Sequence, residues 1–121
     1  MTHDEFIAEY HKFSARVIKL AEKARGEGIL AMEEEIDSGK YNQQDILEYG
    51  IRLVVDGTDA VTIRDILSNI VNQEKDKYAH LLMEIKKEAV LLIQSGGDPQ
   101  FIAFTLDSLT YIKLAFDPNF S

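Results

Sequence analysis

Residues 60–94 have the sequence AVTIRDILSNIVNQEKDKYAHLLMEIKKEAVLLIQ, with apolar residues at helical spacing on both sides of a polar segment, residues 72–77. That segment contains neither proline nor glycine, the two residues that most strongly interrupt a helix. The stretch therefore predicts one continuous helix of about 50 Å, at a rise of about 1.5 Å per residue. Such a helix would form the centre of the fold, with shorter helices packed against it.

The residues nearest the N-terminus predict a long first helix. Thr2 and Glu5 have the spacing of a capping box, in which the side chain of each accepts a hydrogen bond from the backbone amide of the other. Apolar residues then recur at steps of four and three and form a narrow seam on one face. This seam consists of Phe6, Tyr10, Phe13, Val17, Leu20 and Ala24. Gly26 and Gly28 weaken a helix locally and predict a bend.

Two shorter helices are predicted between this bend and the long helix. The first runs from about Ile29 to Asp37, and the second from about Gln44 to Val55, with a loop over residues 38–42 between them. Gly57 suits a left-handed C-cap for the second of these helices. Asp59 is a good N-cap for the long helix that follows.

The sequence pattern of this turn recurs at the end of the long helix. Leu53, Gly57 and Asp59 have counterparts at the same spacing in Leu92, Gly96 and Asp98. Helical hairpins converge on such a pattern for physical reasons, and two copies do not make a repeat protein. Pro99 then opens a last helix, which runs to about Ala115, at a position where its missing amide costs no hydrogen bond.

The predicted fold class is all-α. It is an elongated helical bundle with one long central helix and about five helices in total. The chain has 121 residues, of which 45% are hydrophobic, and this fits a single domain, residues 1–121, with one core.

Composition excludes several functional classes. The net charge is −8, so phosphate backbones and anionic lipids are repelled. No cysteine is present, which rules out disulfides and thiolate chemistry. The longest apolar run is Ala89 to Ile93, whereas a membrane-spanning helix needs about 20 residues. The N-terminus is acidic where a signal peptide would be basic. We therefore expect a soluble cytoplasmic protein that binds no nucleic acid and does not insert into membranes.

The sequence contains no pattern typical of catalysis or of cofactor binding. His3, His11 and His80 lack the paired spacing of metal ligands, and no phosphate-binding glycine loop or nucleophile elbow is present. Residues 33–35 are three consecutive glutamates, but adjacent helical residues point in different directions and do not form a carboxylate pair. We predict neither an enzyme, nor a cofactor, nor a metal site.

Three stretches resemble the cytoplasmic parts of MotA, the stator subunit family of the bacterial flagellar motor. They are residues 24–36 (ARGEGILAMEEEI), 53–59 (LVVDGTD) and 92–99 (LIQSGGDP). In that family, one pair of transmembrane helices precedes the first stretch and another pair lies between the second and third. Residues 70–81 contain no segment of membrane length. The resemblance therefore implies a MotA-like protein without the transmembrane helices. The helical spacing across residues 72–77 and the start at Met1 favour a natural paralogue over a chain with its spans deleted.

The resemblance also implies a partner-binding site. In the MotA family, an arginine before the glycine-containing bend and a glutamate eight residues later meet charges on the rotor protein FliG. These positions correspond to Arg25 and Glu33, and the neighbouring Glu34 and Glu35 are equally suited. Exposed charges contribute steering and orientation more than affinity. The alternative interpretation is that Arg25 faces a helix dipole and that Glu33 is an ordinary surface acid.

The leading functional hypothesis is a soluble stator-like protein that binds FliG or a stator subunit and conducts no ions. The alternative is a structural or assembly protein that keeps only the fold and self-associates as a homo-oligomer. That alternative would use the seam from Phe6 to Ala24 or the face from Tyr78 to Ile93. An unrelated helical enzyme or metal-binding bundle is a third hypothesis, and no motif favours it.

Overall fold

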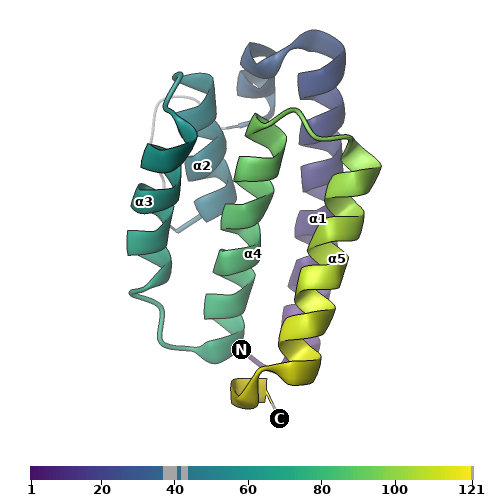
Figure 1. The fold of residues 1–121 in the computed structure, drawn as a ribbon, viewed down its shortest axis with the longest axis vertical. Helices are drawn as coiled ribbons and strands as arrows, with labels where there is room; N and C mark the ends of the chain where they lie inside the picture. The colour runs from purple at the N-terminus through teal and green to yellow at the C-terminus, as the bar shows by residue number, and fades with distance from the viewer. Residues whose placement is uncertain (37–40, 42–43, 121) are drawn as a thin grey trace.

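The computed structural model describes residues 1–36, 41 and 44–120. These residues form five α-helices and two short 3-10 helices, with no strand among them (Figure 1). In chain order the elements are α1 (His3–Glu27), η1 (Ile29–Glu35), α2 (Ile46–Val55), α3 (Ala60–Val71), α4 (Lys77–Gln94), α5 (Pro99–Phe116) and η2 (Pro118–Phe120). The predicted all-α helical bundle is confirmed.

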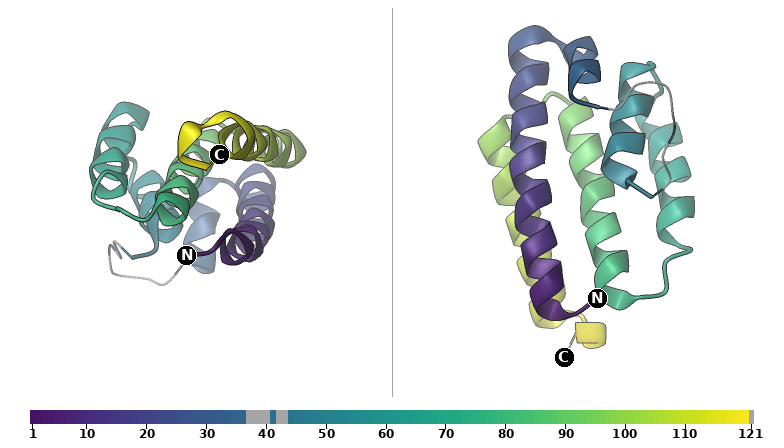
Figure 2. Two further views of the ribbon diagram at one scale, coloured as in Figure 1. Left: turned by 90° about the horizontal axis from the view of Figure 1, so that it is seen from below. Right: turned by 180° about the vertical axis from the view of Figure 1, so that it is seen from behind.

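The prediction of one long helix over residues 60–94 is wrong. Helix α3 ends at Val71, the chain turns over residues 72–76, and α4 returns antiparallel beside α3 (Figures 1 and 2). Asp76 supports the new start, because its carboxylate accepts a hydrogen bond from the Ala79 amide at 2.9 Å. A hairpin buries the apolar faces of both helices against each other, whereas one long helix would leave much of that surface in water.

Two smaller boundaries also differ from the prediction. The segment expected as a helix over residues 29–37 is the 3-10 helix η1, which begins after Gly28 turns the chain with φ of 95°. Helix α2 begins one residue after its N-cap Asp45 rather than at Gln44. The predicted loop over residues 38–42 lies outside the described residues, except for Tyr41. The predicted bend is confirmed at Gly28, while α1 continues through Gly26.

Helix α4 is the central element of the core. It packs against α1, α2, α3 and α5. The seam of α1 and the apolar face of α4 are both buried, with Phe13 at 5% and Leu82 at 6% exposure. Both surfaces predicted for self-association therefore lie in the core. The prediction that they mediate an interface between copies is wrong.

The two turns with similar sequences have the same structure. Gly57 and Gly96 have φ of 84° and 81°, in the left-handed region that favours glycine. The Thr58 amide donates to the Leu53 carbonyl at 3.0 Å, and the Gly97 amide donates to the Leu92 carbonyl at 3.2 Å. These are the hydrogen bonds of a Schellman motif at the ends of α2 and α4. The local sequence therefore predicted both turns correctly.

Gly50 provides a test of the packing between α2 and α4. A Cβ atom at Gly50 would lie 2.5 Å from Cγ2 of Val90. We expect Gly50→Ala to lower the free energy of unfolding by about 1–3 kcal/mol through overpacking. The matched control is Gly26→Ala, because a Cβ there meets nothing within 4 Å. The control should gain about 0.5–1 kcal/mol, since alanine favours a helix over glycine. Urea denaturation measures both, and equal stability of the two variants would contradict the close approach.

Aspartates cap several helices and make the fold sensitive to acid. Hydrogen bonds from Thr62 lower the pKa of Asp59, and the Ala79 amide does the same for Asp76. Burial acts to raise the pKa of Asp45, but hydrogen bonds from Arg16 and from the Glu48 amide outweigh it and lower that pKa as well. All three carboxylates are therefore held in their charged form in the folded chain.

Stability should consequently fall at low pH. Because these pKa values lie below the unfolded value of about 3.9, the stabilisation is complete above that pH and is lost as pH falls through the folded values. We expect the thermal midpoint to change little between about pH 7 and pH 5 and to drop below about pH 4. Circular dichroism melts measure this. A midpoint that stays constant down to about pH 3 would contradict the role of the caps.

Candidate functional site

The three MotA-like stretches meet at one end of the bundle, which is uppermost in Figure 1. We call this region, formed by residues 24–36, 53–59 and 92–99, the turn end. Two hydrogen bonds link its parts. Nη1 of Arg25 donates to the Gly96 carbonyl at 3.3 Å, and Nε2 of Gln94 donates to the Thr58 carbonyl at 2.8 Å. Segments that are remote in sequence therefore form one surface.

The predicted partner-binding residues all lie at the turn end. Arg25 is an exposed residue in the last turn of α1, and Glu33, Glu34 and Glu35 follow on η1. The side chains of Glu33 and Glu34 are 54% and 68% exposed, while that of Glu35 is 25% exposed. The first two glutamates thus present more surface to a partner than the third.

Lys23 and Lys19 pair with the last two glutamates. Nζ of Lys23 lies 2.7 Å from Glu34 and 3.6 Å from Glu35, and Nζ of Lys19 lies 3.3 Å from Glu35. The hydrogen bond from Lys19 holds the pKa of Glu35 below its usual value. Glu35 is therefore neutralised by two cations of α1. The i, i+4 spacing of Lys23 and Glu27 was a visible sequence signal, but the contacts with η1 follow only from the fold.

Arg52 lies immediately before the second stretch of the turn end, and the sequence did not reveal its contact with this region. Its side chain is 10% exposed, and Nη1 lies 3.1 Å from Glu33 and 3.9 Å from Asp56. Its Nε and Nη2 atoms are buried and have no hydrogen-bond partner among the described residues. A buried cation depends strongly on its counter-ion, so Glu33 stabilises the interior as well as facing solvent. Arg52 lies between Ile51 and Leu53 in an apolar helix, and no spacing rule connects it with Glu33.

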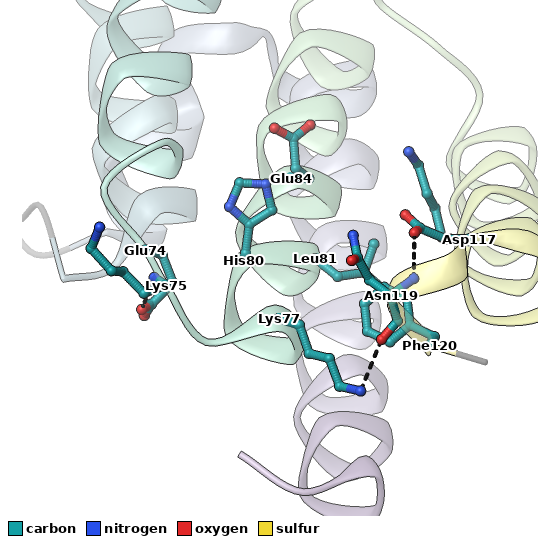
Figure 3. A pocket seen from close by; sticks show the side chains of 10 residues that line it. Glu74, Lys75, Lys77, His80, Leu81, Glu84, Asp117, Asn119 and Phe120 are labelled. Carbon is teal, nitrogen blue, oxygen red and sulfur yellow. Dashed lines mark hydrogen bonds between the residues drawn. The ribbon is translucent and has the colours of Figure 1, made fainter.

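The opposite end of the bundle contains an open cleft of about 520 Å³ (Figure 3). Its walls carry acidic and basic side chains together, including Glu74, Lys77 and Glu84. Nζ of Lys77 donates to the Asn119 carbonyl at 2.8 Å, and Nδ1 of His80 lies 3.1 Å from the Val71 carbonyl. In the described part of the chain, no group of three or more potential ligands could hold a metal ion.

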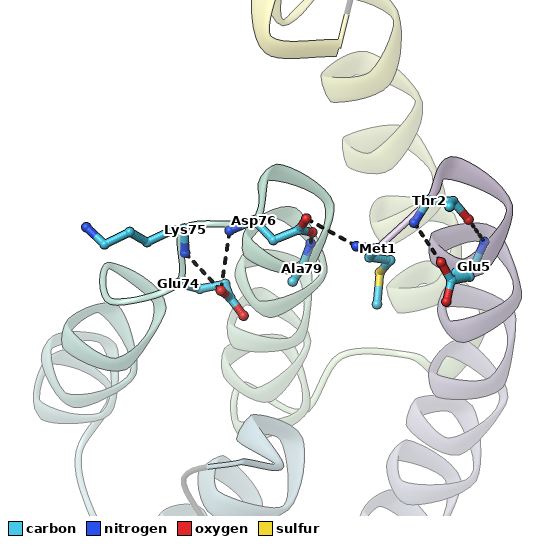
Figure 4. Close-up of polar contacts among 7 residues, drawn as sticks. All are labelled: Met1, Thr2, Glu5, Glu74, Lys75, Asp76 and Ala79. Atoms are coloured by element: carbon cyan, nitrogen blue, oxygen red, sulfur yellow. Dashed lines mark hydrogen bonds and ion pairs between the residues drawn. The ribbon is translucent and has the colours of Figure 1, made fainter.

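The N-terminus lies at that same end, next to the connection between α3 and α4 (Figure 4). The amino group of Met1 is 3.1 Å from Oδ1 of Asp76. The predicted capping box is confirmed, because the Glu5 amide donates to Thr2 Oγ1 at 3.1 Å and the Thr2 amide donates to Glu5 at 2.9 Å. Residues 72–76 and the start of α1 are therefore neighbours in space.

Comparison with known proteins relates this chain to Motility protein A. It is 33% identical over 86 residues to Motility protein A of Treponema phagedenis, covering 69% of this chain and 32% of that protein. It is 34% identical over 73 residues to Motility protein A of Treponema pallidum (strain Nichols), covering 59% and 27% respectively. The chain thus spans less than a third of the length of these curated relatives. The MotA-like relationship inferred from the sequence is confirmed for the matched region.

The other comparisons gave no match. No protein-family model matches the chain, and no solved structure matches it. Within residues 1–36, 41 and 44–120, no helix is both long enough and apolar enough to cross a membrane.

The pairing of Glu33 with Arg52 can be tested by substitution. We expect Glu33→Ala to lower the free energy of unfolding by about 1–3 kcal/mol, because it leaves a buried guanidinium short of its counter-ion. Combining it with Arg52→Met should recover part of this loss. Glu34→Ala is the matched control, because its partner Lys23 keeps Glu35 and Glu27 nearby, and it should cost less than about 0.5 kcal/mol. Urea denaturation compares them, and equal losses in the two single variants would contradict the assignment.

Proposed function

We propose that this chain is a stator-like protein of the flagellar motor system that binds the rotor protein FliG or a stator subunit through its turn end, without conducting ions. One observation carries the proposal. The three MotA-like stretches, which are separated in sequence, form a continuous surface that presents Arg25, Glu33 and Glu34. The partial identity with two Motility protein A sequences supports the same relationship.

The topology supports this orientation. In the MotA family, transmembrane helices precede the first stretch and lie between the second and third. The corresponding places here are the start of α1 and residues 72–76, and both lie at the end opposite the turn end (Figure 1). A bundle of this kind would hold its turn end away from a bilayer. This fits a surface that meets a partner in the cytoplasm.

The charges of the turn end suit a reversible contact. Arg25 is an exposed cation, and Glu33 and Glu34 are exposed over more than half of their side-chain surface. Exposed ion pairs contribute about 0–1 kcal/mol each, yet complementary potentials accelerate and orient association. The net charge of −8 directs the chain towards a basic partner surface. Contacts of this strength can form and break repeatedly.

The test is binding of the purified chain to FliG and to a stator subunit from the same organism, at low and moderate salt. We expect binding that weakens with salt, because screening reduces the attraction between exposed charges. Arg25→Glu should weaken it by about tenfold, which corresponds to about 1.4 kcal/mol. The matched control is Lys12→Glu, which makes the same change of charge on a side chain of α1 that is 76% exposed and lies outside the turn end.

A second pair of variants removes charge without reversing it. Glu34→Gln should weaken binding, whereas Glu9→Gln, on an acid of α1 whose side chain is 48% exposed, should not. Circular dichroism confirms that each variant is folded. The proposal is rejected if neither partner binds at low salt. It is also rejected if Lys12→Glu weakens binding as much as Arg25→Glu, since the loss would then not depend on the turn end.

A further inference from the structure

Helix α5 has two apolar faces, and the bundle buries one of them. Ile102, Leu106 and Thr110 point into the core. On the opposite face of the same helix, five large apolar side chains are exposed. They are Phe101 (61% exposed), Phe104 (67%), Tyr111 (69%), Ile112 (53%) and Phe116 (74%). Helix α5 lies at the edge of the bundle, where α1, α4 and the short η2 are the main described elements that pack against it (Figure 2).

The spacing on the outer face is that of a helix-pairing seam. Phe101, Phe104, Ser108, Tyr111 and Ala115 follow one another at alternating steps of three and four residues. Such a narrow stripe is typical of the a and d positions of a coiled coil. A solvated helix would place polar residues there. From Phe104 onwards, the seam alternates large aromatic side chains with the small residues Ser108 and Ala115.

The exposed area is large for a surface without a partner. At roughly 200 Å² for each large side chain, the exposed fractions of the five apolar residues amount to roughly 600 Å². Each partner in a stable complex contributes about 800 Å². Two copies meeting through this face and its margins would therefore bury nearly the area that a stable dimer needs.

The charge distribution favours a second copy of the chain as the occupant. The chain carries a net charge of −8, but between residues 99 and 116 the charged residues are Asp107 and Lys113, which cancel. Two acidic molecules can meet at α5 without placing like charges together. A bilayer is a poorer fit, because helices that lie on membranes carry several lysines or arginines beside the apolar face. Lys113 is the one basic residue of α5.

We propose that two copies of this chain associate through the outer faces of α5, as an antiparallel helix pair about a two-fold axis near Ser108. Such an interface uses the same patch on both molecules and must be self-complementary. In the two registers that preserve the seam, Phe104 of one copy lies opposite Ser108 or Ala115 of the other. Phe104 thus faces a small residue in both registers, which lets the helices approach closely there, while in the first register Phe101 faces Tyr111 in an aromatic pair.

Sedimentation equilibrium of the full chain at about 100 μM tests the association. We expect a dimer for the natural sequence and a monomer for Phe104→Asp, because a charge at the seam would be buried without a partner. Tyr111→Glu should have the same effect and serves as a second variant. The matched control is Val61→Glu on α3, since Val61 is 71% exposed and lies on a different helix. Circular dichroism checks the fold of each variant.

Cross-linking then tests the location of the interface. The chain has no cysteine, so Ser108→Cys and the control Val61→Cys each introduce a single thiol. A short bifunctional maleimide should link copies of Ser108→Cys and leave Val61→Cys unlinked. Three results overturn the proposal. They are a monomeric natural chain, equal linking of both variants, and a monomer that binds anionic vesicles through α5, which would make the bilayer the occupant.

Discussion

The fold depends on the burial of α4. Its interior residues, among them Leu81, Ile85, Val90 and Ile93, extend around most of its circumference, so neighbours on one side could not cover them. Helices α1, α2, α3 and α5 all pack on it. This requirement explains why the chain reverses after Val71. If α3 continued straight into α4, it could not return to cover that helix. The reversal falls on the polar residues 72–76, which stay in contact with water there.

Local chemistry predicted most of the elements and most of their ends. The capping box at Thr2, the glycines at positions 57 and 96, and the caps Asp59 and Asp98 all act through neighbouring residues, and the structure contains each of them. The break at residues 72–76 could not be predicted in this way. A polar segment without proline or glycine is compatible with helix locally, and the preference for a hairpin arises from tertiary packing. The same limit applies to η1, a 3-10 segment whose conformation is set by its contacts with α1 and α2.

The candidate site likewise contains residues that the sequence could identify and residues that only the fold reveals. Sequence reasoning could select Arg25 and the three glutamates because their segments carry the resemblance. It could not find Arg52 or rank the glutamates, because the partners of these acids come from α1 and α2. The fold also explains why three separated stretches belong together. Arg25 joins α1 to the turn after α4, and Gln94 joins that turn to the one after α2. A change in any one stretch would therefore disturb the surface formed by the others.

The two proposed contacts occupy different surfaces, and this has a geometric consequence. The turn end is charged and lies at the start of α5, while the seam is apolar and runs along its length. An antiparallel pair of α5 helices would place the two turn ends at opposite extremities of the dimer, with both uncovered. Under the proposed function, each turn end of such a dimer would remain free to bind a separate partner. In an assembly that faces one flat surface, all contact sites must lie on the same side. A dimer with its turn ends at opposite extremities does not meet this condition, so it would connect two partners instead.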